Sequence, residues 1–347
     1  MNFTRIRYRF VFSLVGVLLA FWGCKEEPEP EPPFDYSDGV FFVNEGNFQG
    51  GNASLSFLRR SDDSLRDDIF EWENERPLGD VAQSITVIGN RAYIVVNNSG
   101  KVEVVDLPSL RSHCSILGLN SPRYLLPLGN GKALVSDLYS RTISVLDLTN
   151  CAVVGSIATG GWTEEMVLVD NRVFVTQTGT DKLLVIDVGT QTLTDSIFVG
   201  REPNSLVVDQ NGKLWVLCGS ALGLATPQLV RFDLDSLSIE ATFPFASNTL
   251  SPSKLRINNA GDRLYFLNGG IFQMGITDSN LPSQAWIPQS THTWYGLAVD
   301  PVTDHIYAGD ALDFQRRGKV YRFVAGSSTV LATFDAGIIP GEFAFLP

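Results

Sequence analysis

The chain has 347 residues, of which 44 % are hydrophobic and 18 % are charged. This apolar content is enough for a packed core and excludes a wholly disordered chain. The formal net charge of −12 argues against nucleic acid as a partner, because phosphate binding requires a basic surface. With only three histidines and four cysteines, neither a histidine-rich metal site nor a disulfide scaffold is expected.

Residues 1–23 are predicted to be a signal peptide. Arg5, Arg7 and Arg9 precede the apolar run 10–22, which is shorter than the roughly 20 residues of a membrane-spanning helix. Gly23 and Cys24 follow directly, and this ending resembles the lipobox of Bacteroidetes lipoproteins, in which the cysteine is acylated and becomes the new N-terminus. The alternatives are an uncleaved anchor and a plain secreted protein.

Residues 24–37 are predicted to be an extended tether. Glutamate and proline alternate over 28–33, and proline lacks the backbone N–H that helices and sheets require. Acidic residues directly after a lipidated cysteine resemble the signal that exports Bacteroidetes lipoproteins to the cell surface; the alternative is a mere spacer. The expected location is therefore the outer face of the outer membrane, with acyl chains as the only membrane anchor.

A unit of about 40 residues recurs through 38–347. Three apolar runs end in Asp106, Asp147 and Asp187, which are 41 and 40 residues apart. Short runs rich in β-branched and aromatic residues alternate with Asn-Gly and Asp-Asn turns, which indicates strands rather than helices. Four-stranded units of this length in series are typical of a β-propeller.

Seven units account for 38–347. Six begin near Gly79, Ser121, Gly161, Arg201, Leu250 and Thr291. The seventh is split: three strands are expected at 39–43, 53–58 and 65–72, and the C-terminal segment 342–346 would supply the innermost strand. A shared blade closes the ring and removes open sheet edges. The predicted fold class is all-β, a seven-bladed propeller of four-stranded blades, with six or eight blades as alternatives.

Two features resemble bacterial families. Val-Phe-Val-Thr-Gln at 173–177 resembles the YVTN-type propeller repeat of bacterial surface proteins. The opening Gly-Val-Phe-Phe-Val-Asn-Glu-Gly-Asn-Phe at 39–48 and the segment 200–205 resemble a Bacteroidetes family of outer-membrane propeller lipoproteins. Some relatives in that family capture vitamin B12 for a TonB-dependent transporter. The resemblance implies a surface protein that captures a ligand, with a corrinoid as the best-known example and such a transporter as partner.

The binding site is expected on the face that carries the loops entering the innermost strands. Aligned units differ there from blade to blade, whereas the rest of each unit is similar. These loops contribute Gln83, Arg123, Tyr124, Glu164, Glu165, Asn204, Lys254, Trp294, Tyr295 and Glu342. Loops joining second and third strands add Asn44, Glu45, Asn97, Asp137, Tyr139, Asp310 and Phe314. We call this set the rim residues; the alternative is that loop ends are simply polar.

No catalytic residue, cofactor or metal is assigned. Glu164 and Glu165 are the one acid–base pair, but neighbours on a strand are expected to point to opposite faces and so not to act together. One alternative function is a metal-dependent hydrolase or lyase resembling lactonase-type propellers, with ligands such as Glu164, Asn204 and Asp137. Another is a non-catalytic scaffold for a glycan or a protein.

Trp162 and Trp294 precede their innermost strands at corresponding places, where an indole could stack on a ligand. Packing between neighbouring blades is favoured for Trp162, and Trp215 is expected in the core. His292 is the histidine nearest the rim residues.

With Cys24 acylated, three cysteines remain, so at least one thiol is free. A bridge between Cys114 and Cys151 is left open. It is disfavoured because outer strands of neighbouring blades diverge, whereas a disulfide needs Cα atoms within about 7 Å.

Overall fold

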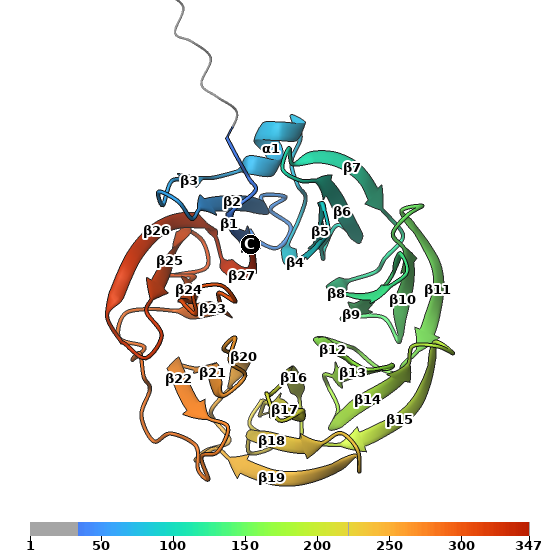
Figure 1. Cartoon of the computed structure of the whole chain (residues 1–347), viewed down its shortest axis with the longest axis vertical. Coiled ribbons are helices and arrows are strands. Elements are labelled where there is room, and N and C mark those ends of the chain that lie inside the picture. Colours follow the sequence, from blue (N-terminus) through green and yellow to red (C-terminus); the bar gives the residue numbers. More distant parts are fainter. Residues whose placement is uncertain (1–33, 221, 347) are drawn as a thin grey trace, which may run out of the picture. The chain divides into compact units, whose positions relative to one another are not determined.

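The computed structural model describes residues 34–220 and 222–346. The predicted signal peptide, Cys24 and the tether up to residue 33 lie outside the described residues. The strands belong to a compact unit, Asp35–Pro347, in which seven antiparallel sheets surround a central axis (Figure 1). Within the described residues, no helix is both long and apolar enough to cross a membrane.

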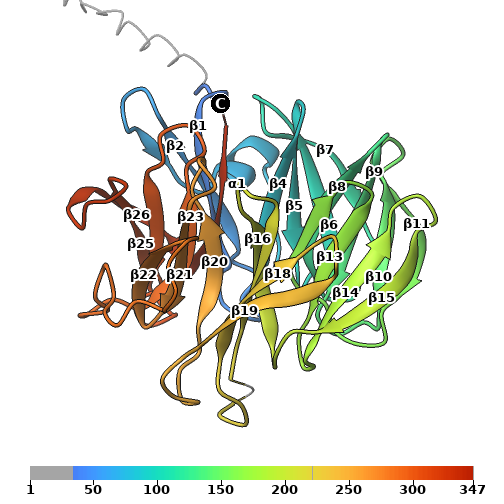
Figure 2. The same ribbon diagram turned by 60° about the horizontal axis from the view of Figure 1, so that its bottom comes forward.

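Blade 1 joins the two ends of the chain. From the axis outwards it contains β27 (Pro340–Phe345), β1 (Gly39–Asn44), β2 (Ser54–Arg59) and β3 (Leu65–Arg66). Figures 1 and 2 both show β27 beside β1, and Phe42 is paired with Phe343 in that ladder. The prediction of an all-β seven-bladed propeller closed by both chain ends is therefore confirmed.

Blades 2, 3 and 4 run outwards in chain order. Blade 2 contains β4 (Ala82–Ile88), β5 (Arg91–Val96), β6 (Lys101–Asp106) and β7 (Arg111–Ile116). Blade 3 contains β8 (Pro122–Gly129), β9 (Lys132–Asp137), β10 (Thr142–Asp147) and β11 (Ala152–Ala158). Blade 4 contains β12 (Met166–Val169), β13 (Arg172–Gln177), β14 (Lys182–Asp187) and β15 (Thr192–Phe198).

Blades 5, 6 and 7 follow the same order. Blade 5 contains β16 (Pro203–Val208), β17 (Lys213–Cys218), β18 (Gln228–Asp233) and β19 (Ser238–Pro244). Blade 6 contains β20 (Ser253–Ile257), β21 (Arg263–Asn268) and β22 (Gly270–Gly275). Blade 7 contains β23 (Trp294–Val299), β24 (Ile306–Asp310), β25 (Arg317–Phe323) and β26 (Val330–Ile338).

Two local predictions differ from the structure. The sheet of blade 6 has three strands, and an isolated bridge between Ile271 and Ile287 takes the place of the fourth. In blade 1 the predicted strand 65–72 stops at Arg66, and a short helix, α1 (Ile69–Asn74), follows it. This helix buries the two neighbouring side chains Ile69 and Phe70, which a strand would direct to opposite faces.

The aspartate that recurs in the sequence ends the third strand of a blade and closes the next turn. Asp147 Oδ1 accepts the backbone N–H groups of Thr149 and Asn150 at 2.9 and 3.0 Å. Asp187 does the same for Thr190 at 2.7 Å. The repeat is therefore explained by turn chemistry, since an Asx side chain satisfies the backbone where the chain reverses.

The hydrophobic core lies between neighbouring sheets. In one cluster, Trp215 and Leu217 of blade 5 pack with Leu264 and Phe266 of blade 6, all fully buried. A single sheet cannot cover both its faces, so each blade depends on its neighbours. The prediction that Trp215 belongs to the core is confirmed.

A disulfide joins Cys114 of β7 to Cys151, which precedes β11. Their Cα atoms are 6.5 Å apart, so the expectation that the outer parts of blades 2 and 3 diverge too far was wrong. The reason is that Cys151 lies in the turn before the outer strand, in the left-handed conformation at φ 52°, and not within the strand. Cys218 is a free, buried thiol, as predicted.

Candidate functional site

The innermost strands share an irregularity at their entry ends. The strand pairing slips in six of the seven inner strands, at Ala82/Ser84, Pro122/Leu125, Pro203/Ser205, Ser253/Arg256, Trp294/Gly296 and Pro340/Glu342. A β-bulge leaves a residue unpaired and changes the direction of its side chain. The residues inside these slips include Gln83, Arg123, Tyr124, Asn204, Lys254 and Tyr295. Local backbone geometry therefore turns the predicted rim residues towards the axis.

A cavity of about 230 Å³, which we call the axial cavity, is lined by these side chains. Nine of the predicted rim residues line it: Gln83, Arg123, Tyr124, Glu164 and Glu165 from blades 2 to 4, and Asn204, Lys254, Trp294 and Tyr295 from blades 5 to 7. Thr178 also lines it and was missed in the sequence, because it lies in a loop with no distinguishing pattern.

Glu164 and Glu165 both line the axial cavity, so the expectation that they face opposite ways was wrong. The backbone N–H of Glu164 donates to the carbonyl of Thr176, and the N–H of Thr176 donates to the carbonyl of Glu165, each at 3.0 Å. Glu164 and Glu165 thus both lie opposite Thr176, as in a β-bulge. The side chains therefore do not alternate between the two faces as in a regular strand. Their carboxylates nevertheless bind different partners.

Arg123 holds Glu164 on one side of the axial cavity. Its Nε lies 3.1 and 2.9 Å from the two carboxylate oxygens, and its Nη1 donates to Gln83. Burial alone would lower the pKa of Arg123, but the charge and hydrogen bond of Glu164, with the charges of Tyr124 and Glu45, together outweigh burial and raise it. The arginine is therefore a fixed cation that links blades 2, 3 and 4.

A second cavity, of about 260 Å³, continues along the axis and shares Tyr124 and Glu165 with the first. Arg256 lies at this junction and binds Glu165 at 2.9 Å and Glu342 at 3.1 Å. Because these three residues belong to blades 6, 4 and 1, a single side chain connects non-adjacent blades across the axis. Lys254 adds a contact to Glu342 at 3.2 Å.

Arg256 is the axial side chain that the sequence prediction missed most clearly. It lies two positions after Lys254 on the same inner strand, so a second basic residue was visible in the sequence. Because Arg256 lies within β20, a prediction based on the loops that enter the inner strands does not include it.

The charged side chains on the axis form what we call the axial network: Arg123, Lys254, Arg256, Glu45, Glu164, Glu165 and Glu342. The pKa values of its carboxyl groups are shifted in opposite directions. Burial raises the pKa of Glu45 and that of Glu165. Burial would also raise the pKa of Glu342, but the charges of Lys254 and Arg256 outweigh it and lower that pKa. Neighbouring carboxyl groups therefore differ in how readily they ionise, as is common at functional sites.

Glu45 and Phe314 lie beside Tyr295 at the edge of this network. The Tyr295 hydroxyl donates to Glu45 Oε2 at 3.1 Å, and the Phe314 ring meets the Tyr295 ring edge-on with centroids 5.6 Å apart. Glu45 is buried, whereas Phe314 is 39 % exposed.

Four predicted rim residues hold loops in place and do not line the axial cavity. Asp137 Oδ2 accepts the backbone N–H of Ser121 at 2.8 Å, and Asn97 Nδ2 donates to the hydroxyl of Ser121 at 2.9 Å. Asp310 accepts two backbone N–H groups, and Asn44 donates to serine hydroxyls of the next strand. All four side chains are buried, so the structure gives them a supporting role.

The exposures of Trp162 and Trp294 are the reverse of those predicted. Trp162 is 44 % exposed and contacts Tyr139 edge-on, whereas Trp294 is 8 % exposed and stacks on His292 with ring centroids 4.3 Å apart. His292 Nδ1 lies 2.8 Å from Asp310 Oδ2. Trp162 therefore contacts the neighbouring blade 3 through Tyr139 but remains partly exposed to solvent.

The proposed metal ligands Glu164, Asn204 and Asp137 do not form a set. Glu164 is bound by Arg123, Asp137 by backbone N–H groups, and Asn204 Nδ2 donates to the carbonyl of Pro252 at 3.0 Å. The geometry here suits recognition by charged and hydrogen-bonding side chains better than the calcium site considered from the sequence.

These features define a seven-bladed β-propeller with a polar, charged site on its axis. The chain belongs to the family described as "Domain of unknown function (DUF5074)", whose model matches residues 38–334. No curated protein matches the sequence.

Several solved structures are similar in fold. A quinonprotein alcohol dehydrogenase-like protein from Bacteroides thetaiotaomicron is 16 % identical with a TM-score of 0.72, over 91 % of this chain and 80 % of that chain. A protein from Lactobacillus plantarum is 13 % identical with a TM-score of 0.69, over 89 % and 99 %. Hydrazine synthase from Kuenenia stuttgartiensis is 16 % identical with a TM-score of 0.60, over 75 % and 88 %. At these identities the likeness shows the fold alone.

Proposed function

We propose that this protein captures a polar small molecule at the axial cavity without changing it chemically. The observation that carries the proposal is the set of bulges in the inner strands of blades 2, 3, 5, 6 and 7, which bring side chains that differ between blades to one cavity. Variable side chains on a rigid, repetitive scaffold are the usual construction of a recognition site.

The hydrogen-bond donors that line the cavity indicate which group of the ligand enters it. The Lys254 ammonium has three N–H donors, yet among the described residues its one hydrogen-bond acceptor is Glu342. Its side chain is only 13 % exposed, so water satisfies little of it. Tyr124, which is partly buried, lines the same cavity as Lys254. A carbonyl oxygen of the ligand would accept from the Lys254 ammonium and the Tyr124 hydroxyl.

The charges favour an uncharged acceptor over an anion. The network holds three cations, Arg123, Lys254 and Arg256, against four carboxyl groups, Glu45, Glu164, Glu165 and Glu342. Because the pKa values of Glu45 and Glu165 are raised, the formal charge of this network lies between −1 and +1, so it has no marked excess of cations to attract an anion. An amide supplies the acceptor without the charge, so we infer an amide-bearing ligand.

The size of the axial cavity indicates that the ligand lies mostly over the face. A cavity of about 230 Å³ is smaller than the roughly 300–1,000 Å³ of a typical small-molecule pocket. Loops on the same face expose aromatic side chains, with Phe48 at 69 %, Tyr139 at 62 % and Trp162 at 44 %. A corrinoid suits this arrangement, because its macrocycle is broad and its periphery carries amide arms.

The family resemblance and the leader sequence complete the proposal. A lipid on Cys24 would hold the protein at the outer face of the outer membrane, and a TonB-dependent transporter would receive the ligand. The exposed aromatic loops support contact with such a partner, because apolar groups on an otherwise polar face are typical of interaction surfaces.

The test is isothermal titration of the purified protein with cyanocobalamin and with cobinamide. We expect one-to-one binding that weakens at least tenfold in Tyr295→Ala and Arg123→Ala. His305→Ala is the matched control, since His305 lies on the opposite face in the β23–β24 turn. Absence of heat with both corrinoids overturns the corrinoid assignment, and full affinity in both axial variants overturns the axial site.

A further inference from the structure

A second group of ligand atoms lies on the outer edge of the propeller, far from the axis in the fold. Cys114 is on β7 of blade 2, Cys151 precedes β11 of blade 3, and His113 is next to Cys114. Their sulfur and ring nitrogen atoms all lie within 4.8 Å of one another. In the part of the chain that the structure describes, no other group of three or more His, Cys, Asp or Glu residues meets this spacing.

Solvent reaches this group. His113 is exposed and both cysteines are partly exposed. His113 Nδ1 lies 3.3 Å from both Asp106 Oδ2 and Arg91 Nη2, so Nε2 is the ring nitrogen that would bind an ion. A carboxylate–histidine contact of this kind orients the imidazole ring at many metal sites. The arrangement therefore has the accessibility and the supporting carboxylate that a metal site requires.

The structure holds the oxidised form, in which the two sulfur atoms are bonded to each other. A disulfide is a poor metal ligand, whereas thiolates bind soft metals strongly. An external reductant, such as a dithiol, would supply two electrons and two protons to the Sγ–Sγ bond and become a disulfide itself. The resulting thiols lose their two protons when a metal ion binds.

We propose that reduction of the Cys114–Cys151 bond creates a site for one thiophilic metal ion of the zinc class, held by His113, Cys114 and Cys151. Two thiolates and an imidazole select zinc, cadmium or copper(I) over calcium and magnesium. Water completes the coordination. The ion then replaces a covalent link between blades 2 and 3 by a coordinate one.

This site has a thermodynamic consequence that separates it from adventitious binding. The disulfide closes a loop with a sequence separation of 37 residues, so its reduction releases a constraint on the unfolded chain. A metal that binds only the folded protein restores stability in proportion to its concentration. Zinc should therefore raise the melting temperature of the reduced protein and leave that of the oxidised protein unchanged.

The experiment uses the full chain with Cys24→Ser and Cys218→Ser, so that the two remaining cysteines are those of the site. Zinc is titrated before and after reduction with a phosphine, in competition with a chromophoric chelator, and cadmium is followed by its thiolate charge-transfer absorption. We expect no ion before reduction and one ion after it. We expect His113→Ala to weaken binding at least tenfold, and the distant His305→Ala to have no effect.

Three outcomes overturn the proposal. These are equal zinc binding by the oxidised and reduced proteins, retention of one tightly bound ion in Cys114→Ser, and unchanged affinity in His113→Ala. If reduction unfolds the chain, circular dichroism reveals it, and zinc must then restore the folded signal. Zinc that binds without restoring it marks binding to the unfolded chain and also overturns the site.

Discussion

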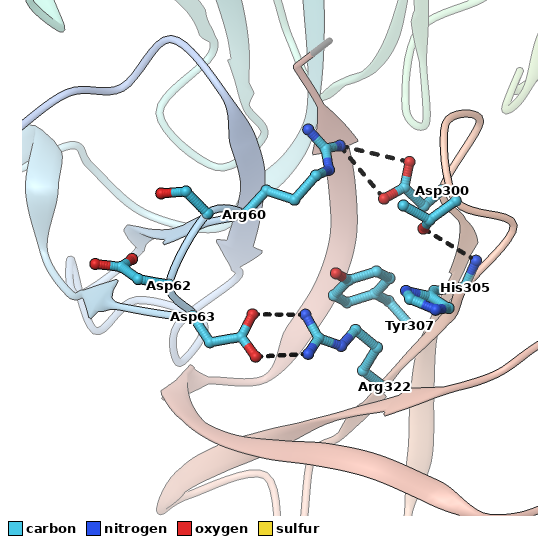
Figure 3. A pocket seen from close by; sticks show the side chains of 9 residues that line it. Arg60, Asp62, Asp63, Asp300, His305, Tyr307 and Arg322 are labelled. Carbon is cyan, nitrogen blue, oxygen red and sulfur yellow. Dashed lines mark hydrogen bonds and ion pairs between the residues drawn. The ribbon is translucent and has the colours of Figure 1, made fainter.

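Two charged cavities of similar size lie on opposite faces of the propeller, and they are built differently. The axial cavity, of about 230 Å³, is lined by bulged residues of inner strands from six blades. The other, about 250 Å³ and here called the closure pocket, is lined by residues of two neighbouring blades, 1 and 7 (Figure 3). The two cavities therefore share side-chain chemistry but differ in which blades supply it.

The closure pocket ties the chain ends together. Arg60 Nη2 lies 3.3 Å from Asp300, and Arg60 Nη1 donates to the carbonyl of Leu346 at 2.9 Å and to Asp38. Figure 3 shows Arg322 directed at Asp63, which it binds through two hydrogen bonds of 2.7 and 2.6 Å. These contacts join the last blade to the first hairpin, where the ring closes without a covalent bond.

The ion pairs of Arg256 and Lys254 on the axis instead join blades that are not neighbours in the ring. Arg256 of blade 6 binds carboxylates of blades 4 and 1. Ring closure needs only contacts between neighbours, so these long-range pairs require a different explanation, and the ligand recognition proposed above would supply one. The comparison teaches that ion pairs in a propeller are best classified by the blades that they connect.

The largest expected effect is on the closure pocket. Arg60→Met leaves Asp300, which is 1 % exposed, without its cation, and should lower the free energy of unfolding by about 3 kcal/mol. Arg59→Met is the matched control: its partner Asp62 is half-exposed, so its effect should be much smaller. Urea denaturation followed by tryptophan fluorescence measures both. Equal losses of unfolding free energy in the two variants would show that Arg60 does not hold the ends of the ring together.

The second expected effect is a difference in stability between variants of Glu342 and Glu165, the two carboxylate partners of Arg256. Glu342→Gln removes a carboxylate whose pKa is lowered, and should cost about 3 kcal/mol at neutral pH. Glu165→Gln imitates the protonated form of a group whose pKa burial raises, and should cost at most about 1 kcal/mol. Urea denaturation of the two variants at pH 7 gives the difference. A larger loss in Glu165→Gln contradicts the assigned pKa directions.

The fold could be predicted because it depends on local pattern. Alternating apolar runs and turn residues recur at one period, and each predicted unit starts five residues or fewer before an inner strand. The split blade followed from the need to pair the edge strand, and 342–346 does overlap β27. Helix α1 was missed because its two buried side chains, Ile69 and Phe70, read as the end of a strand.

The candidate site could be predicted only in part. Its location followed from variation between units, but the shared direction of Glu164 and Glu165 depends on a bulge that no pattern announces. Arg256 and the Cys114–Cys151 bridge depend on distances between blades, and those distances are properties of packing. Sequence periodicity gives the place of a residue within its blade but not its neighbour in the next one.

The third expected effect concerns ligand binding. Lys254→Met keeps the apolar stem but removes the ammonium, and should weaken cyanocobalamin binding about tenfold, because one charged hydrogen bond is lost. Lys213→Met is the control, since that lysine is paired with Asp233 and Glu240 in the outer part of blade 5. Titration calorimetry compares them. If Lys254→Met binds cyanocobalamin as tightly as the wild type, Lys254 does not donate a hydrogen bond to a carbonyl group of the ligand.

The smallest expected effect is a pH dependence within the axial network. The pKa of Glu165 is raised by burial, against the opposing charge of Arg256 and with the added repulsion of Glu342. A raised pKa in the folded state gives stability that is present below the ordinary value near 4.5 and is lost as pH rises through the folded-state pKa. The stability of the wild type relative to Glu165→Gln should therefore fall as pH rises above about 4.5.

Glu103 in blade 2 provides the control of opposite sign. Burial alone would raise the pKa of Glu103, but hydrogen bonds from Arg76 and Ser112 outweigh burial and lower it. Its stabilising contribution is present above the ordinary pKa and is lost as pH falls through the folded-state value. Urea titrations of both glutamine variants across this range should give slopes of opposite sign. Slopes of the same sign would mean that Glu165 is a paired, ionised carboxylate like Glu103, and the axial cavity would then differ from a structural ion pair only in its position.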